Sequence, residues 1–248
     1  MTALSYMYEK DEVLKKIVNA DVIISDFDGT DVKSPLKNAA ISFCSKPHNL
    51  IKNPKLFPWG IEAALTRILV GKDSESRLWT KFSEIIEQDL PTLVSDVKEN
   101  LGSKRTFDDY FLPGVKDFYS LLPNSEKYYA SRNFQEILEI FATEVSIPGE
   151  NIYSELKNKS NALEDILEKR KLRGSFGGIY VLKGDSKSDD EILEIADFYK
   201  RKDFIDDYVG IAVGKSVHSS NKNVDIVSSP DQSKLVEDIR NYLINNPV

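Results

Sequence analysis

The chain has 248 residues, of which 41% are hydrophobic and 29% are charged, a composition typical of globular proteins and not of disordered or membrane-spanning ones. Its net charge of -7 and the lack of a long basic run argue against a nucleic-acid surface. The single cysteine, Cys44, excludes an intrachain disulfide and a cysteine-rich zinc site. With no apolar signal segment or membrane span in the sequence, we expect a cytoplasmic protein with no membrane partner.

The first strong signal in chain order is an apolar run at 22–25 that ends in the acidic turn Asp26-Phe27-Asp28-Gly29-Thr30. A short amphipathic helix is expected before it, over 8–20. The β-branched run predicts a strand buried in a parallel sheet, with both aspartates just past its carboxyl end. Two carboxylates this close repel each other unless a cation lies between them, which favours a magnesium site. A strand followed by an ordinary Asp-Gly turn explains the same residues.

From 35 to 106 the sequence is typical of helices. Apolar residues recur at helical spacing in three stripes, over 61–69, 78–86 and 93–101. We therefore expect a small all-α domain at 35–106, inserted into a core made of 1–34 and 107–248.

After residue 107 strands and helices alternate, which predicts an α/β core with a mostly parallel sheet covered by helices on both faces. The expected helices are 113–122, 134–143, 162–171, 190–200 and 231–244. The expected strands are 127–130, 151–154, 178–182, 208–213 and 224–227.

Ser131 follows the predicted second strand, and Lys159 stands just ahead of the predicted helix 162–171. Ser131 is placed to bind a phosphate oxygen together with the backbone N–H of Arg132, although a helix-capping serine explains it equally well. Lys159 is placed to neutralise a phosphoryl group. A solvated surface lysine is the alternative, and Lys157 is a nearby competitor for the same role.

The stretch 184–190, Gly-Asp-Ser-Lys-Ser-Asp-Asp, sets acids four and five residues apart around a strand-to-helix turn. We interpret Asp185 and Asp189 as metal-binding residues. The alternative is a helix N-terminus enriched in acids, which the helix dipole favours.

Taken in order, Asp-Phe-Asp-Gly-Thr at 26–30, Ser131, Lys159 and Gly-Asp-Ser-Lys-Ser-Asp at 184–189 resemble the four motifs of the haloacid dehalogenase superfamily of phosphohydrolases. The resemblance covers about 20–34 and 110–245. It implies a Rossmann-like core with a helical cap inserted after the first motif.

The resemblance also implies roles. Asp26 would attack phosphorus and form an aspartyl-phosphate, and Asp28 would carry protons to the leaving group and from water. The implied cofactor is Mg²⁺. The metal site would consist of Asp26, Asp28 (through its backbone carbonyl), Asp185 and Asp189, the last orienting a metal-bound water or Lys159; the phosphoryl group would be held by Ser131, Arg132, Lys159 and the turn amides of Phe27 and Asp28.

The resulting prediction is a Mg²⁺-dependent phosphatase acting on a small phosphorylated metabolite. The alternatives are a phosphomutase that uses the same two aspartates and, from another class, a receiver-like phosphoacceptor module. Asp31 stands where the family usually has an apolar residue. We expect this extra acid to repel an anionic substrate unless Lys33 or a cation of the cap offsets it.

Overall fold

The computed structural model describes residues 4–33, 51, 90–103, 105–186, 189–214 and 221–247. The chain divides into two compact units, Met1–Lys33 with Phe107–Val248, and Ser34–Thr106. In the second unit the structure describes one long helix, α6 (Leu90–Ser103), in which Leu93, Val94 and Val97 of the third predicted stripe are buried. The stripes over 61–69 and 78–86 lie outside the described residues.

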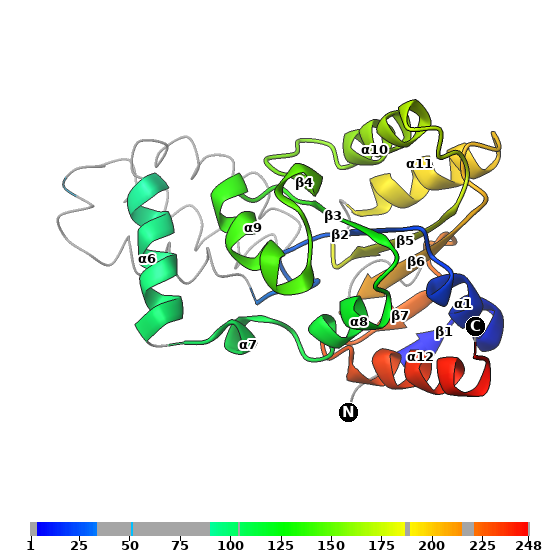
Figure 1. Cartoon of the computed structure of the whole chain (residues 1–248), viewed down its shortest axis with the longest axis horizontal. Helices are drawn as coiled ribbons and strands as arrows, with labels where there is room; N and C mark the ends of the chain where they lie inside the picture. Colours follow the sequence, from blue (N-terminus) through cyan, green and yellow to red (C-terminus); the bar gives the residue numbers. More distant parts are fainter. Residues whose placement is uncertain are drawn as a thin grey trace, which may run out of the picture. The chain divides into compact units, whose positions relative to one another are not determined.

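The first unit is built on a seven-stranded sheet with the order β1-β7-β6-β5-β2-β3-β4 (Figure 1). All neighbouring strands are parallel except β1 and β7, so the predicted, mostly parallel sheet is confirmed. The short edge strand β1 was not predicted. The strands are β1 (Leu4–Tyr6), β2 (Val22–Ser25), β3 (Glu126–Ala130), β4 (Ile152–Tyr153), β5 (Ile179–Gly184), β6 (Asp207–Val213) and β7 (Ile226–Ser228).

Helices cover both faces of this sheet, as expected for right-handed crossovers between parallel strands. The predicted helices of this unit are all present, and their ends lie within two residues of the predicted ends. The helices of the unit are α1 (Lys10–Val18), α7 (Phe107–Tyr110), α8 (Val115–Leu121), α9 (Gln135–Ala142), α10 (Ser160–Leu172), α11 (Asp190–Lys200) and α12 (Ser233–Asn245).

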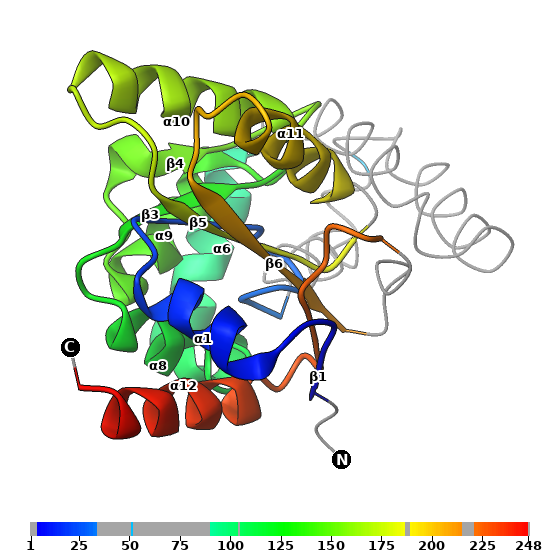
Figure 2. The same cartoon turned by 90° about the vertical axis from the view of Figure 1, so that its right-hand side faces the viewer.

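The two faces of the sheet have separate cores (Figure 2). On one face α10 and α11 bury Ile166 and Leu193 against Ile24 of β2 and Leu182 of β5. The other face is covered by α1, α8, α9 and α12, and Phe141 of α9 packs there against Phe27, with ring centroids 5.5 Å apart. The central strands are thus enclosed on both sides, which is why all four residues of β2 are buried and the first three are apolar.

The register of the central strands brings the predicted site residues to one edge. Ser25, the last residue of β2, pairs with Tyr129 of β3 and with Lys183 of β5. The chain segments that leave these three strands therefore begin side by side. They carry the first, second and fourth sequence motifs.

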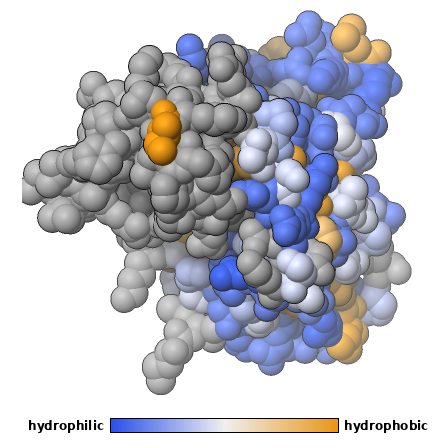
Figure 3. Space-filling view, turned by 90° about the vertical axis from the view of Figure 1, so that its left-hand side faces the viewer, coloured by the Kyte–Doolittle hydropathy of each residue, from blue (hydrophilic) through white to orange (hydrophobic). Residues whose placement is uncertain are grey.

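In the described part of the chain, no helix is long and apolar enough to cross a membrane. On the face shown in Figure 3, hydrophilic residues dominate the described surface and hydrophobic ones are scattered. The exposed large hydrophobic residues of the described chain include Leu172, Phe176 and Phe198.

Phe141 is the centre of an aromatic cluster whose other members are Phe27, Phe107, Tyr110 and Phe111. We expect Phe141→Ala to lower the free energy of unfolding by about 3–5 kcal/mol, because a fully buried ring leaves a cavity. Chemical denaturation monitored by circular dichroism measures this. The control is Phe198→Ala, whose side chain is 45% exposed and which should cost less than about 1 kcal/mol. Equal losses would contradict the assignment.

Candidate active site

The turn after β2 presents Asp26 at the edge of the sheet. Asp26 is 8% exposed, and its backbone N–H donates to the carbonyl of Lys183 on β5 at 2.9 Å. The turn closes on itself, because the N–H groups of Asp31 and Val32 both donate to the carbonyl of Phe27. A hydrogen-bonded loop of this kind holds the side chains of 26 and 28 in fixed directions.

Gly29 allows the fourth motif to approach this turn. Its φ is 81°, a left-handed conformation that favours glycine, and a Cβ there would lie 2.1 Å from Oδ2 of Asp185. The Asp185 carboxylate therefore lies directly over the turn of the first motif. The predicted convergence of residues far apart in the sequence is present in the structure.

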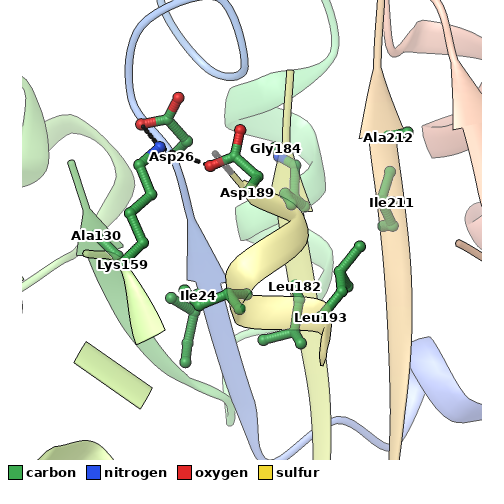
Figure 4. A pocket seen from close by; sticks show the side chains of 12 residues that line it. Ile24, Asp26, Ala130, Lys159, Leu182, Gly184, Asp189, Leu193, Ile211 and Ala212 are labelled. Carbon is green, nitrogen blue, oxygen red and sulfur yellow. Dashed lines mark hydrogen bonds and ion pairs between the residues drawn. The ribbon is translucent and has the colours of Figure 1, made fainter. Parts of the chain in front are cut away.

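Lys159 links two of the predicted site residues (Figure 4). Its side chain is 3% exposed, and its Nζ lies 2.8 Å from Oδ1 of Asp26 and 2.5 Å from Oδ1 of Asp189. Burial alone would lower the pKa of this lysine, but Asp189 and Asp26 outweigh burial and raise it, so the ammonium form is stabilised. Lys157, the competitor in the sequence, is exposed.

Asp189 is engaged by protein donors through both carboxylate oxygens. While Oδ1 accepts from Lys159, Oδ2 accepts the backbone N–H groups of Asp185 and Ser186 and the Ser186 hydroxyl. Although Asp189 is the N-cap residue of α11, its side chain makes no capping hydrogen bond to the helix. The acid-rich helix start therefore does not account for Asp189, which instead orients Lys159 and the turn after β5.

Three carboxylates of this edge fit a divalent cation. One oxygen each from Asp26, Asp185 and Asp189 lie within 4.8 Å of one another. Oxygens bound to one Mg²⁺ lie at most about 4.2 Å apart, so small side-chain movements bring this set to coordination distance. Burial raises the pKa of Asp26 well above its usual value, Lys159 opposes this, and the two neighbouring acids add to it. The cluster thus carries more negative charge than Lys159 balances.

Asp28 is held by a residue that the sequence interpretation missed, Asn133. The Asn133 side-chain amide donates to Oδ2 of Asp28 at 2.8 Å, and its own Oδ1 accepts the N–H of Phe134 at the start of α9. Ser131 supports this residue, because its hydroxyl accepts the N–H of Asn133 at 3.2 Å. Ser131 is therefore not the capping residue of α9. Ser131 is connected to the first motif through Asn133, which donates to Asp28.

The remaining predicted phosphate-binding residues have different surroundings. The ring of Phe27 is fully buried and packs edge-on against Tyr129 at 5.4 Å, so any ligand contact must come from its backbone N–H. Arg132 is half-buried beside Ser131. Among the described residues, no ion pair connects Arg132 to the aspartates of the site. Lys187 and Ser188 of the fourth motif lie outside the described residues.

Asp31 was expected to repel an anionic substrate unless Lys33 or a cation of the cap offsets its charge, but its partner is a different lysine. Asp31 is fully buried, accepts the hydroxyl of Tyr119 at 2.6 Å and pairs with Lys183 at 2.7 Å. The compensating cation is therefore Lys183 of β5. Lys33 is exposed and donates instead to the carbonyl of Asp109.

Comparison with solved structures identifies the fold. DsGPDH of Dunaliella salina matches 94% of this chain at 15% identity with a TM-score of 0.55, although the chain spans only 38% of that protein's chain. Cytosolic 5'-nucleotidase IIIB bound to cytidine matches 98% of this chain and 95% of its own, at 14% identity with a TM-score of 0.53. No model of a protein family matches the chain, and no curated protein sequence does.

A phosphoserine phosphohydrolase-like protein from Francisella tularensis matches 81% of this chain and 90% of its own, at 21% identity with a TM-score of 0.47. The chain shares an α/β fold with cytosolic 5'-nucleotidase IIIB, and its own sheet is mostly parallel. At these identities the likeness is one of architecture. The parallel sheet and the cluster at its carboxyl edge are features of this chain's own structure.

Because a Cβ at Gly29 would collide with the Asp185 carboxylate, we expect Gly29→Ala to displace that carboxylate and weaken Mg²⁺ binding by at least about tenfold. Isothermal titration calorimetry with MgCl₂ measures the affinity. Gly174→Ala is the matched control, since Gly174 also has a positive φ but a Cβ added there would meet no atom within 4 Å. Equal Mg²⁺ affinity in both variants would contradict the assignment of Asp185.

Proposed function

We propose that the protein is a Mg²⁺-dependent phosphatase that hydrolyses a small-molecule phosphomonoester through an aspartyl-phosphate intermediate. The observation that carries this proposal is the placement of buried Lys159 between Asp26 and Asp189, beside the Asp185 carboxylate. A nucleophilic carboxylate, a metal-binding acid and a phosphate-neutralising cation thus meet at one edge of the sheet. The fold shared with cytosolic 5'-nucleotidase IIIB supports the same reaction class.

The chemistry assigns different work to the two aspartates of the first motif. A carboxylate oxygen of Asp26 forms a bond to phosphorus as the ester P–O bond breaks, and Asp28 gives its proton to the leaving oxygen. Asp28 then removes a proton from the water that attacks the phosphorylated Asp26, which releases inorganic phosphate and restores both groups. Bound Mg²⁺, held by Asp26, the Asp28 carbonyl and Asp185, would supply positive charge beside the phosphoryl oxygens.

Hydrogen-bond donors and cations in fixed positions would stabilise the transferring phosphoryl group. Lys159 offers a buried ammonium group, and Ser131 offers a hydroxyl 2% exposed at the end of β3. We assign the turn amide of Phe27 and the backbone N–H of Arg132 to the same group. Donors already in place cost no reorganisation when charge accumulates in the transition state.

The domain organisation and cellular setting belong to this proposal. Residues 35–106, which include α6, are proposed as a helical cap inserted after the first motif. A small phosphorylated metabolite in the cytoplasm is the proposed substrate class.

A phosphomutase would use the same aspartates. Product analysis by ³¹P NMR distinguishes a phosphomutase from a phosphatase, because a mutase releases no inorganic phosphate.

Replacing the nucleophile is the direct test. We expect Asp26→Asn to reduce hydrolysis of p-nitrophenyl phosphate in MgCl₂ by more than about 10³-fold, because an amide is not a competent nucleophile at phosphorus. Phosphate release measures the rate, and the melting temperature confirms folding. The control is Asp197→Asn, which removes a carboxylate from a surface pair with Arg201. Wild-type turnover in the Asp26 variant would refute the nucleophile assignment.

The role of Asn133 gives a second test. Asn133→Ala removes the hydrogen bond to Asp28, so we expect kcat on p-nitrophenyl phosphate to fall about 10- to 100-fold, with KM changed by less than about threefold. Asn133→Asp retains an acceptor for the Phe134 N–H but places a like charge beside Asp28. It should therefore lower kcat while leaving the melting temperature near that of wild type. Unchanged kcat in both variants would remove Asn133 from the mechanism.

A further inference from the structure

A fully buried ion pair lies in the core of the sheet unit and has no part in the reaction described above. Nζ of Lys183 lies 2.7 Å from Oδ1 of Asp31, and both side chains are 0% exposed. The Tyr119 hydroxyl donates to the other oxygen of Asp31 at 2.6 Å. The ammonium group also lies 4.5 Å from the ring centroid of Phe118. Each charged atom of the pair therefore has a defined partner.

Stability alone is a weak explanation for such a pair. Removing two charges from water costs most of what their attraction returns, and apolar residues of similar volume stabilise a core as well or better. A buried pair does, however, impose a single arrangement on the segments that carry it. The segments joined here are the turn of the first motif and strand β5, two residues before Asp185.

Lys183 contacts both ends of the turn that presents the nucleophile. Its carbonyl accepts the N–H of Asp26 at 2.9 Å, and its ammonium group holds the Asp31 carboxylate. The backbone of Asp31 is fixed as well, because its N–H donates to the carbonyl of Phe27 and its carbonyl accepts the N–H of Leu112. The 26–31 turn is thus attached at two points to one residue of the strand that leads to Asp185.

We propose that Asp31 and Lys183 are positioning residues that set the separation between the Asp26 and Asp185 carboxylates. The inference rests on the proposed function for its effect on turnover, but its effect on metal binding does not need that function. The Asp185 carboxylate lies against Gly29, which belongs to the same 26–31 turn. A shift of this turn along β5 would therefore change the separation between the Asp26 and Asp185 carboxylates. The mechanism gives neither Asp31 nor Lys183 a contact with substrate.

The test replaces the pair by apolar residues while leaving no buried polar group unpaired. The variant is the triple substitution Asp31→Leu, Tyr119→Phe and Lys183→Met, in which the tyrosine hydroxyl is removed because it would lose its acceptor. We expect a folded protein with a melting temperature equal to or above that of wild type. We expect Mg²⁺ affinity to fall at least about tenfold and kcat on p-nitrophenyl phosphate to fall about 10- to 100-fold, with KM little changed.

The chain offers a matched control on its surface. Asp165 and Lys169 of α10 form a pair of the same length, 2.7 Å, and Asp165 likewise accepts a tyrosine hydroxyl, from Tyr153. The pair is 43–53% exposed and is not attached to either motif turn. The corresponding substitutions Asp165→Leu, Tyr153→Phe and Lys169→Met should leave Mg²⁺ affinity and kcat unchanged.

The readouts separate this inference from the proposed function. A folded core triple variant that binds Mg²⁺ and turns over substrate as wild type does would overturn the positioning role. If wild type itself hydrolyses no phosphomonoester, the proposed function fails, and the Mg²⁺ titration alone decides the inference. If the triple variant does not fold, Tyr119→Phe replaces it. This milder change should weaken Mg²⁺ binding about threefold, and an unchanged affinity would equally overturn the role.

Discussion

The ammonium group of Lys159, buried between two carboxylates, is the interaction on which the edge of the sheet depends. It joins the first motif to the fourth, because Asp26 follows β2 and Asp189 follows β5. Without it, several acids would share a buried space, and most of them would have to take up protons. With it, part of the negative charge of Asp26, Asp185 and Asp189 is balanced, and these three residues still form a group that could hold a divalent cation.

A second pair of buried charges, Lys183 and Asp31, lies in the core, and its surroundings differ from those of Lys159. Lys183 and Asp31 neutralise each other fully and are closed to solvent, whereas Lys159 leaves carboxylates available. The two lysines therefore have different roles. Lys159 belongs to the site itself, and Lys183 belongs to the framework that holds the turn of the first motif against β5.

The sequence predicted the parts of this structure that local patterns determine. A run of β-branched residues predicted the buried strand before Asp26, apolar periodicity predicted the helices of the sheet unit, and the order of the motifs predicted that Lys159 and Asp185 lie in the site. Asn133 and the partner of Asp31 could not be found in this way, because hydrogen bonds across more than 100 residues depend on tertiary neighbours. Edge strand β1 has three residues, too few to show a period of two. A polar residue near a motif serine was the one signal for Asn133.

The surroundings of Asp26 and Asp28 support the different roles that we propose for these two residues. Burial raises the pKa of Asp26, so this carboxylate stays ionised only beside cations, namely Lys159 and the proposed metal ion. Oδ2 of Asp28 accepts a hydrogen bond from the neutral side-chain amide of Asn133, which helps to fix the direction of this carboxylate. The proposed reaction requires Asp28 to release a proton and then to take one back, and a fixed direction favours both transfers. In the proposed reaction, the Lys159 ammonium group stabilises the ionised Asp26, and Asn133 orients Asp28 for proton transfer.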